Sequence, residues 1–408
     1  MDLAVFLDQR FFRTPDGTVW TMDSCAHSFF HRYLTVFDGV VPVARIEEVN
    51  RPGPSWKPAS GPGVSFQAVP HYFGSWDYLT QSRQVKKAAG SALQNGHAII
   101  LRVPSQVANS VETKLRRSGR PYAVEVVGDP HDLYAPGSVR HPLRLFFRRW
   151  FRHRLRAQCA AASAAAYVTA QVLQQRYPST SATLTTNYSS VELPAEAFAA
   201  QPRAFAPQDV TRLIAVGSLQ FPYKGADLLI EALQRCLRNG LRAQLEIVGE
   251  GRLRSVLQQS AASKGLAGHI RLTGPATPGE GVRARLDEAD LFVHPSRAEG
   301  LPRAMIEAMA RGLPCIGSRA GGIPELLSPE DTVPVGDPQA LADKIAEAIR
   351  DPERMTRMSA RNWAKARDYQ EEVLQQRRNQ LYAYLKDITE NWSAGRSPKL
   401  PELNGSTR

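Results

Sequence analysis

The sequence predicts an α/β protein with two Rossmann-like domains that face each other across a cleft. The chain has 408 residues, and domains usually hold about 100–200 residues, so two domains are expected. In both halves, short β-branched runs alternate with longer amphipathic segments, which is typical of βαβ units and parallel sheets. Residues 193–209 are proline-rich without periodicity, and we expect them to be the linker. Ligands of such domains bind at the carboxyl ends of the strands.

The first domain, residues 1–192, shows this alternation less regularly than the second. Residues 50–63 contain four prolines and three glycines and are expected to form a loop. Strands are expected at residues 3–7, 40–44, 98–103 and 123–127, and helices at residues 23–33, 78–94, 106–118 and 140–156.

The second domain, residues 210–368, is predicted more clearly. Its strands are expected at residues 212–216, 244–248, 270–273, 291–294 and 314–317, and its helices at 226–237, 253–264, 284–288, 303–311 and 338–350. Residues 369–392 are expected to hold a last helix that returns toward the first domain. Residues 393–408 show no periodicity and are expected to be a disordered tail.

Composition excludes several classes of protein. The four cysteines form no CxxC pair, which argues against a disulfide scaffold or a zinc module. No stretch reaches the about 18–20 apolar residues that cross a bilayer, and the start of the chain does not resemble a signal peptide. A cytoplasmic protein is therefore expected. The formal net charge is +12, and residues 1–200 carry 22 Lys and Arg against 14 Asp and Glu, which indicates an anionic partner.

The strongest candidate site is the sequence EGLPRAMIE, from Glu299 to Glu307. It follows a predicted strand and leads into a predicted helix, whose N-terminus suits an anion such as a pyrophosphate. Gly300 allows a ligand to approach the backbone closely, and Pro302 fits the first turn of a helix. The two glutamates suit the vicinal hydroxyls of a sugar or a ribose. Taken alone, they also fit a helix-initiating carboxylate and a solvated helix face.

Four motifs in residues 216–327 together resemble the donor domain of retaining glycosyltransferases of family 4, which have the GT-B fold. They are VGSLQFPYKGADLLIEAL, IVGEG, the Glu-x7-Glu signature within LFVHPSRAEGLPRAMIEAMARG, and the glycine-rich turn in SRAGGIPELL. The resemblance implies a nucleotide-sugar donor that is bound mainly by the second domain. It implies no metal and no cofactor, because a lysine and helix amides can neutralise the leaving diphosphate.

By this resemblance, each motif has a part in donor binding. Lys224 contacts the pyrophosphate, Glu299 holds hydroxyls of the transferred sugar, and Glu307 holds the ribose. Backbone around the donor comes from Gly217, Ser218, Gly249, Gly251, Gly300 and Leu301. Gly249 and Gly251 fit a plain turn equally well. Ser218 stands where the family often has an arginine.

The acceptor side of the cleft is predicted from weaker signals. Asp129 ends a predicted strand of the first domain, where the family often has a histidine, and His131 follows two residues later. Asp129 is ranked first as the catalytic residue on this side, although Asp129 before Pro130 equally fits the start of a turn. Asp16 and Gly17, in the loop after the first strand, are also placed on the acceptor side.

Residues 140–156 predict a contact with an anionic membrane surface. The segment contains seven arginines and no acidic residue. A basic amphipathic helix with aromatic side chains is typical of membrane-surface elements. The residues assigned to this contact are Arg144, Phe147, Arg148, Trp150, Phe151 and Arg152. In the alternative interpretation, the aromatic residues pack on the first domain and the arginines are solvated or alone meet lipid.

These observations predict a retaining hexosyltransferase on the cytoplasmic face of the inner membrane. Its acceptor is expected to be a lipid-linked glycan in cell-surface polysaccharide biosynthesis. One alternative is the same fold acting on a soluble sugar phosphate or small metabolite. Another is a non-enzyme that binds nucleic acid or lipid. No nucleic-acid partner is expected, because the basic residues cluster with bulky apolar ones rather than along a groove.

Overall fold

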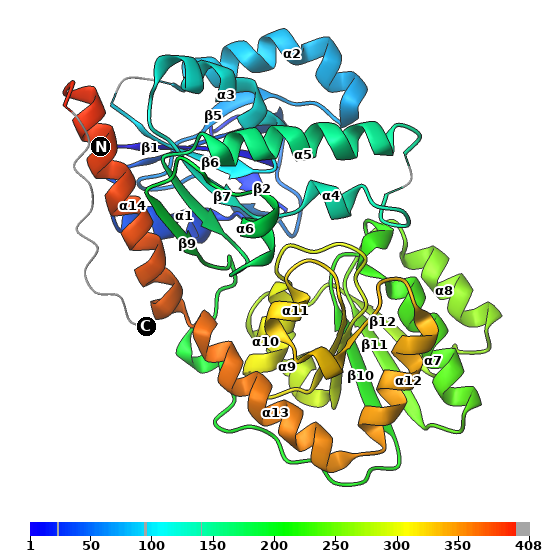
Figure 1. Cartoon of the computed structure of the whole chain (residues 1–408). Helices are drawn as coiled ribbons and strands as arrows, with labels where there is room; N and C mark the ends of the chain where they lie inside the picture. The colour runs from blue at the N-terminus through cyan, green and yellow to red at the C-terminus, as the bar shows by residue number, and fades with distance from the viewer. Residues whose placement is uncertain (23, 94–95, 140, 397–408) are drawn as a thin grey trace.

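The computed structural model describes residues 1–22, 24–93, 96–139 and 141–396. It has two layered α/β units, each built on its own sheet, and the last helix runs back along the first unit (Figure 1). Among the described residues, no helix is both long enough and apolar enough to cross a bilayer. The predicted tail begins at Ser393, which still belongs to a helix, and residues 397–408 lie outside the described residues.

The first sheet is parallel in its centre, with short antiparallel strands at one edge. Its order is β4-β2-β1-β6-β7-β8-β9, and β3 pairs with β1 and β5. The antiparallel pairs are β1–β2 and β2–β4. The strands are β1 (Leu3–Arg13), β2 (Val19–Thr21), β3 (Val40–Glu48), β4 (Lys57–Pro58), β5 (Gln67–Pro70), β6 (Ala98–Val103), β7 (Ala123–Val126), β8 (Ala164–Tyr167) and β9 (Leu184–Asn187).

Several segments of this sheet differ from the predictions. Strands β2, β5 and β9 were not predicted. The expected loop at residues 50–63 contains β4, which extends the antiparallel edge. Strand β8 was not predicted, because its AAAY sequence has neither β-branched residues nor alternation; all four residues are buried. A fully buried strand of small residues has no period that distinguishes it from other apolar runs.

Helices cover both faces of the first sheet. The helix predicted at residues 106–118 matches α3, which Ser105 caps by accepting a hydrogen bond from Ala108 N at 3.1 Å. The basic helix predicted at 140–156 is α5, which begins four residues later and ends four residues later than expected. The helices are α1 (His27–Leu34), α2 (Gly74–Ser91), α3 (Gln106–Ser118), α4 (Pro130–Leu133), α5 (Arg144–Ala160) and α6 (Val172–Arg176).

The second sheet is fully parallel, with the order β12-β11-β10-β13-β14-β15. Its strands are β10 (Thr211–Val216), β11 (Ala243–Val248), β12 (Ile270–Gly274), β13 (Leu291–His294), β14 (Cys315–Ser318) and β15 (Thr332–Val333). The flanking helices are α7 (Ala226–Arg238), α8 (Arg254–Ser263), α9 (Glu280–Glu288), α10 (Arg303–Ala310), α11 (Ile323–Leu326), α12 (Pro338–Ile349) and α13 (Pro352–Ala366). Helix α13 was not predicted, although Asp351 followed by Pro352 is a helix-start signal.

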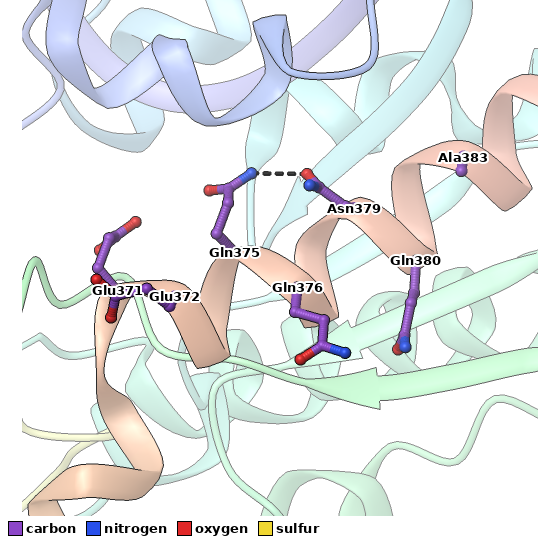
Figure 2. A pocket seen from close by; sticks show the side chains of 7 residues that line it. All are labelled: Glu371, Glu372, Gln375, Gln376, Asn379, Gln380 and Ala383. Carbon is purple, nitrogen blue, oxygen red and sulfur yellow. Dashed lines mark hydrogen bonds between the residues drawn. The ribbon is translucent and has the colours of Figure 1, made fainter.

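The last helix, α14 (Glu371–Ser393), packs on the first unit, as predicted (Figure 1). Tyr382 OH donates to Glu125 of β7 at 3.1 Å, and the guanidinium of Arg378 donates to Ser189 O at 2.9 Å. A hollow of about 770 Å³ lies along this helix; Figure 2 shows the side chains that line it, among which Gln375 donates to Asn379 at 2.8 Å. Its lining residues all belong to α14, so it is a surface groove rather than part of the cleft.

Candidate active site

The candidate site is built from loops at the carboxyl ends of β10, β11, β13 and β14. Gly217 follows β10, and the 3-10 helix η2 (Pro222–Lys224) then leads into α7. The loop that carries Glu299 and Gly300 joins β13 to α10, which begins at Arg303. Parallel strands end at the same edge of a sheet, so these loops meet there.

Glu299 is the centre of a buried polar cluster. Its Oε1 atom accepts from Lys224 Nζ at 2.6 Å and from Ser296 Oγ at 2.8 Å, and it lies 2.7 Å from His294 Nε2. The Glu299 side chain is 7% exposed and that of Lys224 is 23% exposed. The structure therefore brings the two predicted donor-site charges into direct contact. Ser296 and His294 are partners that the motif did not predict.

The electrostatics of this cluster keep Glu299 ionised. Burial alone raises the pKa of the Glu299 carboxyl, but the Lys224 ammonium and the His294 ring lower it by more, so its pKa lies well below the ordinary value. A buried ion pair is stable when further hydrogen bonds satisfy the remaining polar atoms of the two side chains. Lys224 also lies over the Tyr223 ring, with Nζ 5.4 Å from the centroid. These two contacts, with Glu299 and with the Tyr223 ring, hold the Lys224 ammonium in place between β10 and α7.

Glu307 lies half-buried on α10 and contrasts with Glu299. Burial raises the pKa of its carboxyl, and the nearby Glu192 raises it further, while Arg303 and Arg283 lower it less. Among the described residues, its carboxylate has no ion pair within 4.0 Å and no hydrogen bond. A partly buried carboxylate without such a partner is available to a ligand hydroxyl.

The two glycines after β11 are required by backbone packing. A Cβ at Gly249 would lie 1.9 Å from Gly217 O, and a Cβ at Gly251 would lie 2.2 Å from Gln220 N. Gly249 N also donates to Gly274 O at 2.8 Å. The plain-turn interpretation of these glycines therefore accounts for their positions, and their contact with a donor stays a prediction.

Gly300 is where the two units touch beside the site. A Cβ at Gly300 would lie 2.6 Å from Val127 O and 3.3 Å from Val168 Cγ2, both in the first unit. Gly322 N donates to Gly300 O at 2.7 Å, so the Gly321–Gly322 turn supports this loop. Leu301 is 8% exposed and belongs to the core. The side chain of Leu301 thus packs in the core, and only its backbone remains a candidate for donor binding.

Ser218 is exposed in the loop after β10, and its Oγ accepts from Gln220 N at 3.2 Å. Its contact with a donor stays a prediction. Asp16 and Gly17 lie in the turn between β1 and β2, where Asp16 accepts from Thr18 N at 3.1 Å. These bonds lower the pKa of the Asp16 carboxyl, the largest cause being its bond with Thr14. The structure gives both residues a part in forming the turn.

The carboxylate of Asp129 is engaged by other residues of the first unit. It caps α4 by accepting from His131 N at 2.8 Å, and it also accepts from Tyr177 OH and pairs with Arg176. Its side chain is 0% exposed. These contacts match the turn-starting alternative and give Asp129 a structural role. His131 is 27% exposed at its side chain and is the more accessible of the two.

Helix α5 uses part of its predicted membrane face to contact the α4 segment. The Phe151 ring stacks on Tyr134 with centroids 5.7 Å apart, and Phe147 lies 5.9 Å from the same ring. Arg148 donates from Nε to His131 O at 2.9 Å. Phe147, Phe151 and Arg148 thus contact the α4 segment, as in the alternative interpretation where aromatic residues pack on the first domain. Their contact with lipid stays a prediction. Trp150, Arg144 and Arg152 are half-buried.

Solved structures show the same architecture. Sucrose-phosphate synthase from Thermosynechococcus elongatus superposes with a TM-score of 0.67 at 18% identity, over 94% of this chain and 99% of that chain. HepE from Anabaena, in complex with UDP and glucose, superposes with a TM-score of 0.61 at 18% identity, over 97% and 100%. The chain has the GT-B fold.

Sequence comparison relates the second unit to one family. Residues 210–351 match the model for glycosyl transferases group 1. Protein CapJ of Staphylococcus aureus is 24% identical over 320 residues, which are 76% of this chain and 78% of that protein. The amylovoran biosynthesis glycosyltransferase AmsK of Erwinia amylovora is 38% identical over 128 residues, 29% of this chain and 31% of AmsK.

A third relative acts on a lipid, according to its name. The GDP-mannose-dependent alpha-(1-6)-phosphatidylinositol monomannoside mannosyltransferase of Mycolicibacterium smegmatis is 34% identical over 155 residues, 35% of this chain and 40% of that protein. The matched segment thus covers less than half the length of that enzyme and of AmsK. Among the described residues, no group of three or more His, Cys, Asp or Glu is arranged to hold a metal ion. The prediction that no metal or cofactor is required stays a prediction.

Proposed function

We propose that this GT-B protein is a retaining glycosyltransferase that moves a hexose from a nucleotide-sugar to a lipid-linked glycan in cell-surface polysaccharide biosynthesis. The observation that carries the proposal is the buried Lys224–Glu299 pair at the carboxyl edge of the second sheet, followed by the unpartnered Glu307 on α10. The names of AmsK and the mannosyltransferase, and the UDP bound to HepE, support the same reaction class.

In the proposed reaction, each side chain has a separate task. Lys224 moves from Glu299 toward the donor diphosphate and neutralises the charge that develops as the sugar–phosphate bond breaks. Ionised Glu299, held by His294 and Ser296, then accepts hydrogen bonds from sugar hydroxyls. Glu307 accepts hydrogen bonds from the ribose hydroxyls. The acceptor hydroxyl attacks from the face that the diphosphate leaves, and the leaving phosphate oxygen takes its proton.

An anionic membrane surface is proposed to hold the acceptor near the cleft. The exposed face of α5 and the residue before it carry three bulky apolar side chains, Leu143, Leu145 and Phe146, which are 56%, 61% and 59% exposed. Arg149 and Arg156 are exposed on the same helix. Apolar side chains next to arginines match a lipid surface with negative headgroups. We name these five residues the α5 face.

A transfer assay tests the proposed function. Purified protein is incubated with UDP-, GDP- and ADP-sugars and, in separate reactions, with a prenyl-diphosphate-linked disaccharide or a soluble sugar phosphate as acceptor. The anomeric configuration of the product is read by NMR. Transfer with retained configuration supports the proposal. Inverted configuration, or transfer only to a soluble sugar phosphate, contradicts the mechanism or the acceptor, respectively. No transfer and no sugar-nucleotide hydrolysis would contradict the enzyme assignment.

A further inference from the structure

A narrow crevice opens at the carboxyl ends of β6 to β9 in the first unit, on the side of the donor loops. Arg32 of α1, Arg102 of β6 and Ser190, which follows β9, contribute to its wall. Its volume is about 10 Å³, which is room for one water-sized atom such as a phosphoryl oxygen. The motifs and the donor-site residues do not explain why two arginines, Arg32 and Arg102, lie in the wall of this crevice.

The carboxylate in the crevice wall, Glu125, is already neutralised. Its Oε2 accepts from Arg102 at 2.6 Å and from Tyr33 at 3.0 Å. Its Oε1 accepts from Tyr188 at 2.9 Å and from Tyr382 at 3.1 Å. Four donors therefore surround one 2% exposed carboxylate. The single negative charge of Glu125 is thus balanced by Arg102, and none remains to pair with the guanidinium of Arg32.

Arg32 is the guanidinium without a comparable partner. It is 8% exposed, and its Nε atom is buried without a hydrogen-bond partner. Its nearest acid is Glu192, 3.5 Å away with a side chain that is 58% exposed. Burial lowers the pKa of Arg32, and the charges of Arg378 and Arg102 lower it further. Arg378 is paired with Glu371 at 2.7 Å, whereas Arg32 has only the exposed Glu192. An additional anion would therefore be stabilised at Arg32.

The crevice borders the reaction site. Val127 and Val168 belong to its wall, and Gly300 packs directly against both residues. Gly300 is adjacent to Glu299, the proposed ligand of the transferred sugar. A group bound at the mouth of the crevice would thus lie next to the loop that holds the sugar, on the opposite side of the domain boundary.

We propose that Arg32, with Arg102 and Ser190 beside it, binds a phosphoryl group of a substrate at the mouth of this crevice. A guanidinium matches the oxygens of a phosphoryl group, and burial strengthens such a contact. The inference rests on the proposed function, in which two phosphorylated substrates meet at this cleft. The phosphoryl group comes from the acceptor's lipid diphosphate or from the donor's diphosphate.

The test uses thermal shift and titration on the full chain. The probes are UDP, GDP and ADP, and then geranyl diphosphate with the best-binding nucleotide at saturation, so that the donor site is occupied. The variants are Arg32→Gln and Ser190→Asp, which adds a negative charge at the half-buried rim and keeps the buried arginine. Arg116→Gln on α3 is the matched control, because Arg116 is 60% exposed. Glu307→Ala reports on the donor site alone.

Each result has a defined meaning. Binding of geranyl diphosphate that weakens about tenfold or more in Arg32→Gln and Ser190→Asp, with nucleotide binding unchanged, supports the acceptor as the source. The same loss in nucleotide binding supports the donor as the source. Unchanged binding of both probes in both variants, or no binding of either by the wild type, overturns the inference. Nucleotide binding that is lost in Glu307→Ala but unchanged in the crevice variants leaves the proposed function standing without this site.

Discussion

Lys224 Nζ lies 2.6 Å from Glu299 Oε1, so the two charges proposed to handle the donor neutralise each other in the structure. The lysine comes from the loop after β10 and the glutamate from the loop after β13, strands that are neighbours in the sheet. The pair keeps both side chains ordered at the mouth of the cleft. In the proposed function, donor binding exchanges the carboxylate for a phosphate as the partner of Lys224.

Glu299→Gln is expected to lower kcat/KM for sugar transfer by about 10²-fold or more, because it removes a charge held for the transition state. It should also reduce the free energy of unfolding at pH 7. The lowered pKa of Glu299 means that its ionised form stabilises the native state above the ordinary glutamate range. This stabilisation is lost as pH falls toward the lowered pKa, so wild type and variant should converge in acid.

Initial rates and urea unfolding at pH 7 and at acidic pH measure these effects. Glu288→Gln is the control, since Glu288 is 61% exposed on α9. Equal activity of wild type and Glu299→Gln would remove Glu299 from the mechanism.

Glu307→Gln should have the opposite effect on stability. The raised pKa of Glu307 means that the native state binds its proton more tightly than the unfolded state. Ionised Glu307 therefore costs stability at neutral pH, and this cost disappears as pH falls below the ordinary glutamate pKa. The variant should unfold at a higher denaturant concentration at pH 7 and show no gain in acid. A variant that is less stable at pH 7 would contradict the assignment of Glu307 as an unpaired site carboxylate.

Gly300→Ala is expected to impair transfer by forcing the two units apart at the site. Its Cβ would lie 2.6 Å from the backbone oxygen of Val127, a contact that side-chain rotation cannot relieve. We expect a loss of activity larger than the loss of stability. Gly268→Ala is the matched control, because a Cβ there meets no atom within 4 Å. Wild-type activity in Gly300→Ala would show that this contact does not matter for catalysis.

The α5 face is expected to bind anionic membranes. Leu145→Asp and Arg149→Glu together should abolish flotation with vesicles that contain phosphatidylglycerol, and vesicles of phosphatidylcholine alone should bind neither protein. Each basic residue near such a surface contributes about 1 kcal/mol. Phe151→Leu, at a position that packs on Tyr134, should leave flotation unchanged. Equal flotation of wild type and the double variant would place the membrane contact elsewhere.

Tyr382→Phe tests the attachment of α14 to the first unit. Tyr382 is 0% exposed and donates to Glu125 at 3.1 Å. Losing this bond to a buried carboxylate should cost about 1–3 kcal/mol of unfolding free energy. Tyr384→Phe, at a half-buried position on the same helix, should cost less. Equal losses in denaturant unfolding would contradict a specific role for the Tyr382 bond.

The sequence predicted the second sheet well because its strands are β-branched runs separated by periodic helices. It missed β8, whose AAAY sequence has no period, and it did not show that Phe147 and Phe151 of α5 contact Tyr134. In α5, aromatic and basic residues alternate closely, so the pattern does not say whether Phe151 or Leu145 faces solvent. Tyr134, which decides this by stacking on Phe151, is distant from it in sequence.

The donor-site pair Lys224 and Glu299 was predicted from motifs, whereas its supporting contacts were not. His294 is the last residue of β13, and the motif treats it as a strand residue. Its bond to Glu299 depends on the loop turning back over the strand end. Likewise, the sequence pattern predicts an accessible Asp129 at a strand end. In the structure its carboxylate is enclosed by Arg176 and Tyr177, which come from a later segment. Long-range contacts of this kind carry no local signal.

Nucleotide binding tests the central claim most directly. UDP, GDP and ADP are titrated calorimetrically into the wild type, Glu307→Ala and the control Glu288→Ala. We predict that one nucleoside diphosphate binds the wild type and the control, and that Glu307→Ala weakens it by about tenfold or more. Equal affinity in Glu307→Ala, or no binding of any of the three to the wild type, would contradict the nucleotide-sugar site.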